Sequence, residues 1–170
     1  MKSEILKLII KTETPFNISS GSKGDSYIKD LSVRDRDGKP FIPGTTIKGK
    51  IRENYRKMNT DEETKKLFGH AKEPSRIIVD DFYAVEDCKI LVRYGNAIDR
   101  FRKVTKDGAL FSKEGVCGKF QGEIEVNYEN EEELDNVRLA IKMIEAIGGS
   151  KSTGFGNVKI EEVKEWEESE

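Results

Sequence analysis

The order of strand-like and helix-like segments constrains the fold of this 170-residue chain more than any other feature. A buried strand shows a run of apolar residues or alternation with polar ones, whereas a helix repeats its apolar residues every three or four positions. In chain order these patterns give strand, helix, strand, strand, helix and strand, with one short extra helix after the first. Such an order predicts an α+β fold in which an antiparallel sheet carries helices on one face.

The patterns also set approximate bounds for each element. The predicted strands are 5–10, 76–85, 119–128 and 155–166, and the predicted helices are 45–58, a short one from Thr60 to Gly69, and one from Asn130 to Gly148. Without the short helix, this is the βαββαβ order of the ferredoxin-like fold.

Residues suited to capping precede the helical segments. Thr45 or Thr46 can accept hydrogen bonds from the exposed amide groups of the first helix. Thr60 and Glu63 have the spacing of a capping box, in which each side chain satisfies a backbone amide near the other.

Two long segments interrupt the core order. Residues 15–42 follow the first strand and are rich in Gly, Ser, Asp and Lys, which predicts a long loop insertion. Residues 88–117 contain short apolar pieces separated by turn signals, which predicts a projecting, hairpin-like insertion between the second and third strands. We therefore interpret residues 1–170 as a single domain with two insertions.

Charge is segregated along the chain, although the net charge is only −2. Residues 1–59 hold 13 Lys and Arg against 7 Asp and Glu, whereas residues 129–170 hold 5 against 12. Residues 93–119 are also basic, with 7 against 3. This segregation favours a polyanion-binding face opposed by an acidic face, although solvated helices can produce the same pattern.

Several kinds of chemistry are excluded by composition. His70 is the only histidine, so a serine-type triad or a histidine-rich metal site is not expected. Cys88 and Cys117 have neither the spacing nor the histidines of a zinc site, and we expect two buried free thiols. Catalysis would have to use carboxylates, lysines or a recruited metal. The apolar runs are too short to span a membrane and the first residues lack a secretory signal, so we expect a cytoplasmic protein without a membrane partner.

A glycine-rich loop, GGSKSTGFG at 148–156, joins the last predicted helix to the last strand. Its four glycines allow close approach of the backbone to a ligand, and Lys151, Ser152 and Thr153 offer a charge and two hydroxyls. It is not a P-loop, because the glycine-lysine pairing is absent and the loop runs from helix to strand. A glycine-rich turn needed only for packing is the alternative.

Two separated motifs carry a family resemblance. FIPGTTIKGKIR at 41–52, followed by LFG at 67–69 and RIIVDD at 76–81, together with the glycine-rich loop, resembles the RAMP superfamily of CRISPR proteins, which serve antiviral defence. Within that family the chain is most similar to the repeated backbone subunit of type III effector complexes. The resemblance implies a ferredoxin-like, RNA-recognition-motif-like core.

The resemblance implies that both motifs lie against the backbone of a guide RNA. The implied RNA-binding residues are Thr45, Thr46, Lys48 and Arg52 in the first motif, and Gly149, Ser150, Lys151, Ser152 and Thr153 in the second. Phosphates would meet a helix start, where unpaired amides already favour anions. Lys50 and Arg56 can equally be surface cations that favour solubility. The RNA is then expected to cross the sheet between the two motifs.

The insertion at 88–117 resembles the family's thumb, a hairpin that wedges into the duplex of guide and target. Phe101, Val104, Leu110 and Phe111 offer apolar surface for such a wedge, and Arg100, Arg102, Lys103 and Lys106 offer cations for phosphates. Phe111 fits an ordinary core position equally well.

The resemblance also implies a catalytic aspartate after the first strand. Asp30 stands at the matching position, and Asp25 is the second candidate. The carboxylate would hold a divalent cation, Mg or Mn, that is not tightly bound and that helps to cut the target RNA paired to the guide. Asp35 and Asp37 fit the turn at DRDG instead.

Three functions remain open at this point. The first is a backbone subunit that coats guide RNA as a head-to-tail filament of its own copies, contacts other CRISPR subunits, and is an endonuclease when assembled. The second is a capping or other non-cutting RAMP subunit. The third is a RAMP-type endonuclease that processes the guide precursor with His70 as its general base.

Overall fold

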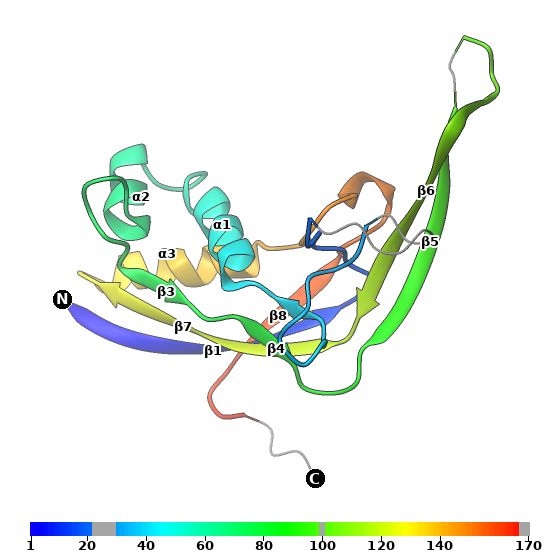
Figure 1. The fold of residues 1–170 in the computed structure, drawn as a ribbon. Coiled ribbons are helices and arrows are strands. Elements are labelled where there is room, and N and C mark those ends of the chain that lie inside the picture. The colour runs from blue at the N-terminus through cyan, green and yellow to red at the C-terminus, as the bar shows by residue number, and fades with distance from the viewer. Residues whose placement is uncertain (22–29, 99–100, 167–170) are drawn as a thin grey trace.

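A computed structural model describes residues 1–21, 30–98 and 101–166 of the chain (Figure 1). Within these residues the strands are β1 (Lys2–Thr12), β2 (Phe41–Ile42), β3 (Ile77–Val79), β4 (Phe82–Ala84), β5 (Lys89–Ile98), β6 (Thr105–Cys117), β7 (Lys119–Tyr128) and β8 (Val158–Val163). The helices are α1 (Gly44–Tyr55), α2 (Asp61–Phe68) and α3 (Glu131–Lys142), and a short 3₁₀ helix spans Lys151–Thr153.

In the described residues, six strands form one sheet in the order β2-β4-β7-β1-β8, and β3 also pairs with β7. Every neighbouring pair is antiparallel. The alternation of 119–128 appears in β7 as a strict alternation of half-buried and buried residues. The predicted α+β class with an antiparallel sheet is therefore confirmed.

The helices cover one face of the sheet (Figure 1). Ile47 and Ile51 of α1 are fully buried, as are Ile124 and Val126 of β7, because the apolar face of each element meets the same core. No described helix covers the opposite face, which carries half-buried glutamates of β7 as well as exposed apolar side chains, and Trp166 lies against Lys7 there. None of the described helices is long and apolar enough to cross a membrane.

The starts of α1 and α2 are satisfied in different ways. The predicted capping box of α2 is confirmed, since the Thr60 hydroxyl accepts from the Glu63 amide while the Glu63 carboxylate accepts from the Thr60 amide. The prediction that Thr45 or Thr46 caps α1 is wrong, because Pro43 occupies the N-cap position and both threonines lie inside the first turn.

A carboxylate from a distant strand connection takes the role of the missing cap. The Gly44 amide donates to Asp81 Oδ1 at 2.7 Å. Asp81 lies between β3 and β4, where the predicted continuous strand 76–85 is in fact broken into two short strands. A carboxylate at this end also complements the helix dipole.

Two predicted helix ends are wrong. Helix α1 ends at Tyr55 rather than near 58, and α3 ends at Lys142 rather than at Gly148. Ile144 and Ile147 continue the apolar stripe predicted for α3 and are buried, but they lie in the irregular chain that follows it. The apolar residues of the stripe therefore remain buried beyond the last residue of the helix.

Strands β5 and β6 pair with each other as a separate hairpin that projects from the end of the main sheet (Figure 1). Gly118 alone separates β6 from β7, and it exchanges hydrogen bonds with the Thr12 hydroxyl at the end of β1. Cys88 and Cys117 are free thiols at the base of this hairpin. Both are half-buried, not fully buried as expected, and burial raises the pKa of the Cys88 thiol.

Candidate nucleic-acid interface

Asp30 lies beside the hairpin strand β6. The Glu114 amide donates to the Asp30 carbonyl at 3.0 Å, and the Asn17 side-chain amide donates to the same carbonyl at 3.4 Å. The Asp30 carboxylate forms an ion pair with Lys113, whose Nζ is 3.2 Å from Oδ2. The hairpin base therefore fixes the position of Asp30.

The other carboxylate oxygen of Asp30, Oδ1, is buried and has no hydrogen-bond partner among the described residues. A buried acceptor without a partner is costly, so such an atom is a place where a ligand or ion would be stabilised. The second candidate, Asp25, lies outside the described residues.

The buried carboxylate of Glu114 joins the Asp30 segment to the hairpin. The Glu114 side chain is 1% exposed, and it forms an ion pair with Arg34 and accepts from the Ser32 amide at 3.4 Å. The Asn17 side-chain amide donates to the Glu114 carbonyl at 2.9 Å. The charge of Glu114 is therefore compensated by a cation and a backbone donor, as burial requires.

The glycine-rich loop packs tightly against this assembly. Gly148 and Gly156 have φ angles of +73° and +84°, and a Cβ atom would lie 2.3 Å from the Asn17 carbonyl oxygen at the first and 2.1 Å from the Ile147 carbonyl oxygen at the second. These two glycines are needed for packing, as the alternative interpretation predicted. Around Gly149, by contrast, a Cβ atom would meet only Lys113 Nζ, at 3.7 Å, so the chain does not pack tightly against this side of Gly149.

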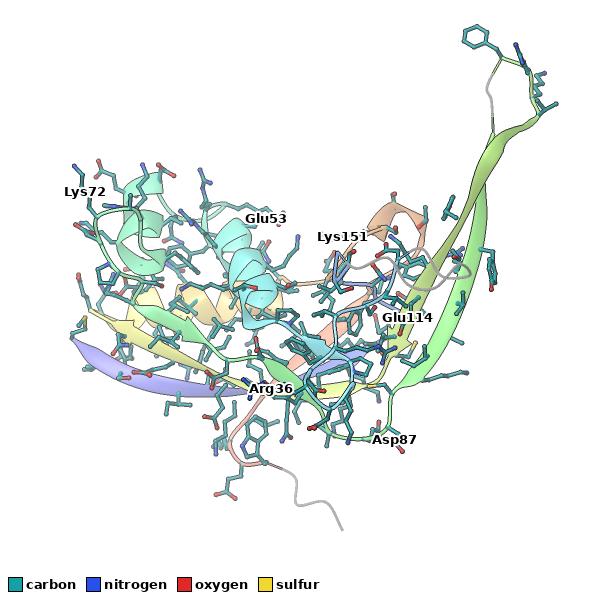
Figure 2. All side chains as sticks on the ribbon, in the orientation of Figure 1. Arg36, Glu53, Lys72, Asp87, Glu114 and Lys151 are labelled. Atoms are coloured by element: carbon teal, nitrogen blue, oxygen red, sulfur yellow. The ribbon has the colours of Figure 1, made fainter. Side chains whose placement is uncertain are left out.

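Helix α1 meets the loop through Lys50. The neighbouring Lys50 ammonium lowers the pKa of Lys151. Glu53 pairs with Lys50 at 2.6 Å and raises the pKa of Lys50. Two ammonium groups so close together repel each other, and a phosphate beside them would relieve that repulsion. Figure 2 shows Lys151 between Glu53 on α1 and Glu114 at the hairpin base.

The predicted RNA-binding residue Lys48 of α1 points elsewhere. Lys48 Nζ donates to the Ile77 carbonyl of β3 at 2.8 Å, and burial, with a smaller contribution from Arg52, lowers the pKa of Lys48. Thr45 is exposed, whereas Thr46 and Arg52 are half-buried. The structure therefore brings Lys50, rather than Lys48, to the glycine-rich loop.

The hairpin carries further predicted or newly found side chains near its base and farther along its strands. At its base Arg93 donates to the Thr153 carbonyl at 2.9 Å and lies over the Phe155 ring at 5.3 Å. Farther out, Phe111 is 50% exposed and its ring covers Gly95, the residue opposite it in register. Phe111 is thus a hairpin surface residue and not part of the domain core.

The tip of the hairpin carries the remaining predicted groups. Phe101 is 100% exposed and Val104 is 55% exposed, and Arg102 and Lys103 are also exposed. Arg100 lies outside the described residues. Since the tip is far from the loop in Figure 1, the predicted RNA-binding residues form a basal group and a distal group.

His70 lies away from both groups. Its Nδ1 accepts from the Lys72 amide at 3.1 Å, in the turn that follows α2. Figure 2 shows Lys72 at the opposite end of the molecule from Lys151 and Glu114. His70 therefore cannot act together with the Asp30 segment.

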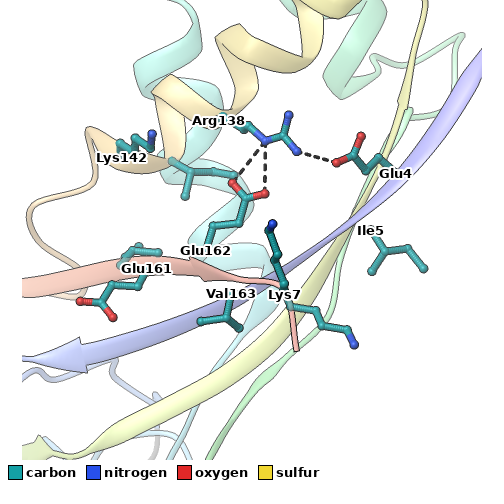
Figure 3. Close-up of a pocket in the computed structure, with 11 residues that line it drawn as sticks. Glu4, Ile5, Lys7, Arg138, Lys142, Glu161, Glu162 and Val163 are labelled. Atoms are coloured by element: carbon teal, nitrogen blue, oxygen red, sulfur yellow. Dashed lines mark hydrogen bonds and ion pairs between the residues drawn. The ribbon is translucent and has the colours of Figure 1, made fainter. Parts of the chain in front are cut away.

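A separate groove of about 790 Å³ lies between β8, α3 and the start of β1 (Figure 3). Arg138 crosses it, donating to Glu162 at 3.2 Å and to Glu4 at 2.5 Å. Arg138 thereby links α3 to β1 and β8 across the groove.

Sequence reasoning missed the residues that hold the interface together. Lys113, Glu114 and Asn17 carry no local motif, because their partners are 13 to 97 residues away along the chain. The surplus of cations in 93–119 was the available signal, but it could not show that Arg93 and Lys113 lie opposite each other in the hairpin.

Comparison with known proteins places this arrangement in a family. Residues 9–159 match the model of the RAMP superfamily. The chain is 32% identical over 197 residues to the CRISPR system Cms endoribonuclease Csm3 of Methanocaldococcus jannaschii, and the match covers 94% of this chain and 79% of that protein.

Solved structures agree on the fold. A chain of the type III-B Cmr-beta bound to cognate target RNA superposes with a TM-score of 0.78 at 15% identity, covering 95% of this chain and 98% of that one. A chain of the apo state of the type III-B Cmr-beta gives a TM-score of 0.72 at 15% identity, covering 94% and 97%. Since the family model spans residues 9–159 and the Csm3 match covers nearly the whole chain, this protein belongs to the RAMP superfamily.

Proposed function

We propose that this chain is a guide-RNA-binding backbone subunit of a type III CRISPR complex, and that Asp30 takes part in cutting the target RNA paired to the guide. The observation that carries the proposal is the meeting of three segments at Lys113: the Asp30 segment, the hairpin base and the glycine-rich loop. The similarity to a protein named as a CRISPR endoribonuclease supports the same function.

The strand order supports a ferredoxin-like, RNA-recognition-motif-like core within a single RAMP domain of residues 1–170. In this interpretation β1, the pair β3 and β4, β7 and β8 are the four core strands, and their order β8-β1-β7-β4 is that of an antiparallel βαββαβ sheet. Helices α1 and α3 are the core helices. Residues 15–42 and the thumb-like 88–117 are then insertions.

The guide RNA is proposed to run along the helix side of the sheet, where the glycine-rich loop faces α1. Lys50 and Lys151 would contact its phosphates, and its backbone would pass the side of Gly149 where the chain does not pack tightly. Thr45 and Thr46 would lie on the same path. The open sheet face is less suited to a polyanion, because the outward residues of β7 include Glu123 and Glu125.

A divalent cation at Asp30 fits the structure only if the RNA completes its coordination. Oδ1 offers a buried acceptor without a partner among the described residues, but those residues contain no group of three or more His, Cys, Asp or Glu that could hold a metal. Mg²⁺ is commonly held by one or two carboxylates together with substrate phosphates. When bound, such an ion would neutralise charge on the scissile phosphate.

The role of Asp30 itself follows from its surroundings. Lys113 holds Oδ2, and Oδ1 is buried without a partner among the described residues. A movement of the side chain or of its surroundings must therefore expose Oδ1 before it accepts a hydrogen bond from a target 2′-hydroxyl or contacts the ion. Attack of that hydroxyl on the adjacent phosphorus would release the 5′-oxygen of the next nucleotide. Phe101, Val104 and Phe111 on the hairpin would separate bases of the duplex to expose that bond.

The proposed partners are the guide RNA, the target RNA, further copies of this chain and other subunits of the complex, in the cytoplasm. Residues 129–170 carry 12 acidic against 5 basic residues, and residues 1–59 carry the opposite surplus. The two segments pair some of these charges within one chain, and a head-to-tail filament would let other acidic residues of one copy face basic residues of the next.

The lysine pair provides a direct test of RNA binding. Replacing Lys151 by alanine should weaken binding of a single-stranded guide RNA and reduce the slope of log affinity against log salt concentration by about 0.7, because one phosphate contact is lost. The double variant K50A/K151A should lose about twice that slope. Fluorescence anisotropy at several salt concentrations measures both.

Lys65→Ala is the matched control, since Lys65 is an exposed lysine on α2, paired with Asp61. Its salt slope should equal that of the unchanged protein. Equal slopes in all four proteins would remove Lys50 and Lys151 from the RNA path.

Copy number separates a repeated backbone subunit from a terminal, non-cutting one. We expect native mass spectrometry of the assembled complex to show several copies of this chain for each guide RNA, because one hairpin per copy would mark the duplex at regular intervals. A single copy would instead identify a capping subunit.

The guide-processing alternative predicts that the isolated chain cuts RNA without a metal. Cleavage of a guide precursor in EDTA, lost on His70→Ala, would support it. We expect no such cleavage, because His70 lies away from Asp30 and from the glycine-rich loop.

A further inference from the structure

We infer that Lys113 is a positioning residue that connects the glycine-rich loop, the proposed binding segment for the guide RNA, to the carboxylate of Asp30. The inference rests on the proposed function for its catalytic consequence, but its geometric part stands on contacts of the chain alone. Lys113 Nζ lies 3.2 Å from Asp30 Oδ2 and donates to the Ser150 hydroxyl at 2.8 Å. One ammonium group therefore connects two loops that are 120 residues apart in the sequence.

The contacts of Lys113 are partly shielded from water. Its side chain is 20% exposed and that of Asp30 is 27% exposed, so the ion pair is less screened than a pair on the open surface. Charge-assisted hydrogen bonds are also shorter and stronger than neutral ones. An ammonium held on two sides in this way can fix a carboxylate, whereas an exposed lysine generally cannot.

Ser150 is the centre of the glycine-rich loop. Its carbonyl accepts from the Thr153 amide at 3.0 Å, from the Thr153 hydroxyl at 2.8 Å and from the Phe155 amide at 3.4 Å. Its own φ is +61°, a conformation that residues with a Cβ atom rarely adopt. The contact with Lys113 therefore acts on the residue to which Thr153 and Phe155 are hydrogen-bonded.

The hairpin aims a second cation at the same loop. Arg93 is the residue opposite Lys113 in the β5-β6 register, and it donates to the Thr153 carbonyl. Like charges directly opposite each other destabilise a strand pair. The pair is tolerated here because each cation has partners in the loop, and Lys113 has Asp30 as well.

Backbone contacts keep the distances between these segments constant. The Gly149 amide donates to the Asn17 carbonyl at 2.9 Å, and the Asn17 side chain donates to the Asp30 carbonyl. Asn17 thus ties together the main chains of both loops, and Lys113 ties their side chains. Lys113 is consequently the contact whose removal frees the Asp30 carboxylate without separating the loops.

The test compares Lys113→Met with Lys113→Arg in the assembled complex. We expect K113M to lower the single-turnover rate of target cutting by about tenfold to a hundredfold, the usual effect of removing a group that orients a reacting one. Any loss of guide or target affinity should account for only a small part of this decrease when both RNAs are saturating. K113R should restore most of the rate, because a guanidinium can donate to a carboxylate and a hydroxyl at once.

Lys89→Met is the matched control, since Lys89 is an exposed lysine on the neighbouring strand of the same hairpin. It should cut at the unchanged rate. The inference is overturned if K113M also cuts at the unchanged rate, if K113R fails to restore the rate, or if lost RNA affinity accounts for the whole loss, which would make Lys113 an ordinary phosphate ligand.

Amide hydrogen exchange of the full chain without RNA tests the geometry independently of cutting. K113M should accelerate exchange at Thr153 and Phe155, whose amides donate to Ser150, while the amides of the β1-β7 ladder remain protected and show that the chain is folded. Unchanged exchange at both loop positions overturns the inference. If cutting proves independent of Asp30, the proposed function fails on that point, and the exchange result still decides whether Lys113 holds the loop.

Discussion

A complex assembled with Asp30→Ala should bind guide and target RNA normally but cut the target at least about a hundredfold more slowly, since a positioned carboxylate contributes on that scale to proton transfer or metal-assisted cleavage. Asp30→Asn should be equally slow, because it retains an acceptor for Lys113 but loses the charge. Single-turnover cleavage with radiolabelled target gives the rate, and filter binding gives the affinity.

Asp37→Ala provides the control for a carboxylate in the same insertion. Asp37 is exposed in the turn at 35–38, where Asp35 Oδ1 accepts from the amides of Asp37 and Lys39, so the expected structural role of Asp35 is confirmed. Asp37→Ala should cut normally. Normal cutting by D30A would remove Asp30 from the mechanism, and parallel loss of cutting and RNA binding would assign it a structural role instead.

Gly156→Ala should destabilise the chain by about 3 kcal/mol or more, the largest stability effect expected here. A left-handed φ of +84° costs an alanine about 1–2 kcal/mol. The added Cβ would also lie 2.1 Å from the Ile147 carbonyl oxygen, so the chain must shift and weaken the bonds of Gly156 to Ile147 and Pro15. Each lost hydrogen bond adds about 1 kcal/mol.

Gly154→Ala separates the two contributions. Its φ of +83° is nearly identical, but a Cβ atom there would meet nothing within 4 Å. It should cost only about 1–2 kcal/mol, the conformational part alone. Urea denaturation followed by circular dichroism measures both variants, and equal destabilisation would show that the contact with Ile147 does not matter.

Local patterns in the sequence were sufficient to predict the helices and strands that bury one face. The alternation in 119–128 and the capping box at Thr60 each depend on residues within a few positions, and both are confirmed. The sequence did not reveal the break in 76–85. The apolar and aromatic residues on both sides of Asp80 and Asp81 predict one continuous strand, although both aspartates are also common in turns. Only the pairing of β3 and β4 with β7 shows where the break falls.

The candidate site depends on contacts between residues far apart in the sequence, and hydrophobic periodicity does not reveal such contacts. Asp81 lies 37 residues from the Gly44 amide that it accepts from, and Lys113 lies 37 residues from Ser150. The family resemblance pointed to the loop and to Asp30, but it could not show that Lys48 faces the Ile77 carbonyl while Lys50 faces the loop. Which side of α1 meets the loop is decided by how the helix packs on the sheet.

The contacts of Arg93, Lys113 and Glu114 with the rest of the domain make the outer part of the hairpin a lever whose pivot lies at the level of Lys113. Strand β6 begins at Thr105, eight residues before Lys113, so its far end lies roughly 26 Å from the pivot at about 3.3 Å per residue. A tilt of about 10° at this pivot would move that end by roughly 5 Å, more than one base step along a nucleic acid strand. The position of the hairpin tip over a bound duplex therefore depends on these anchoring contacts as well as on the residues of the tip.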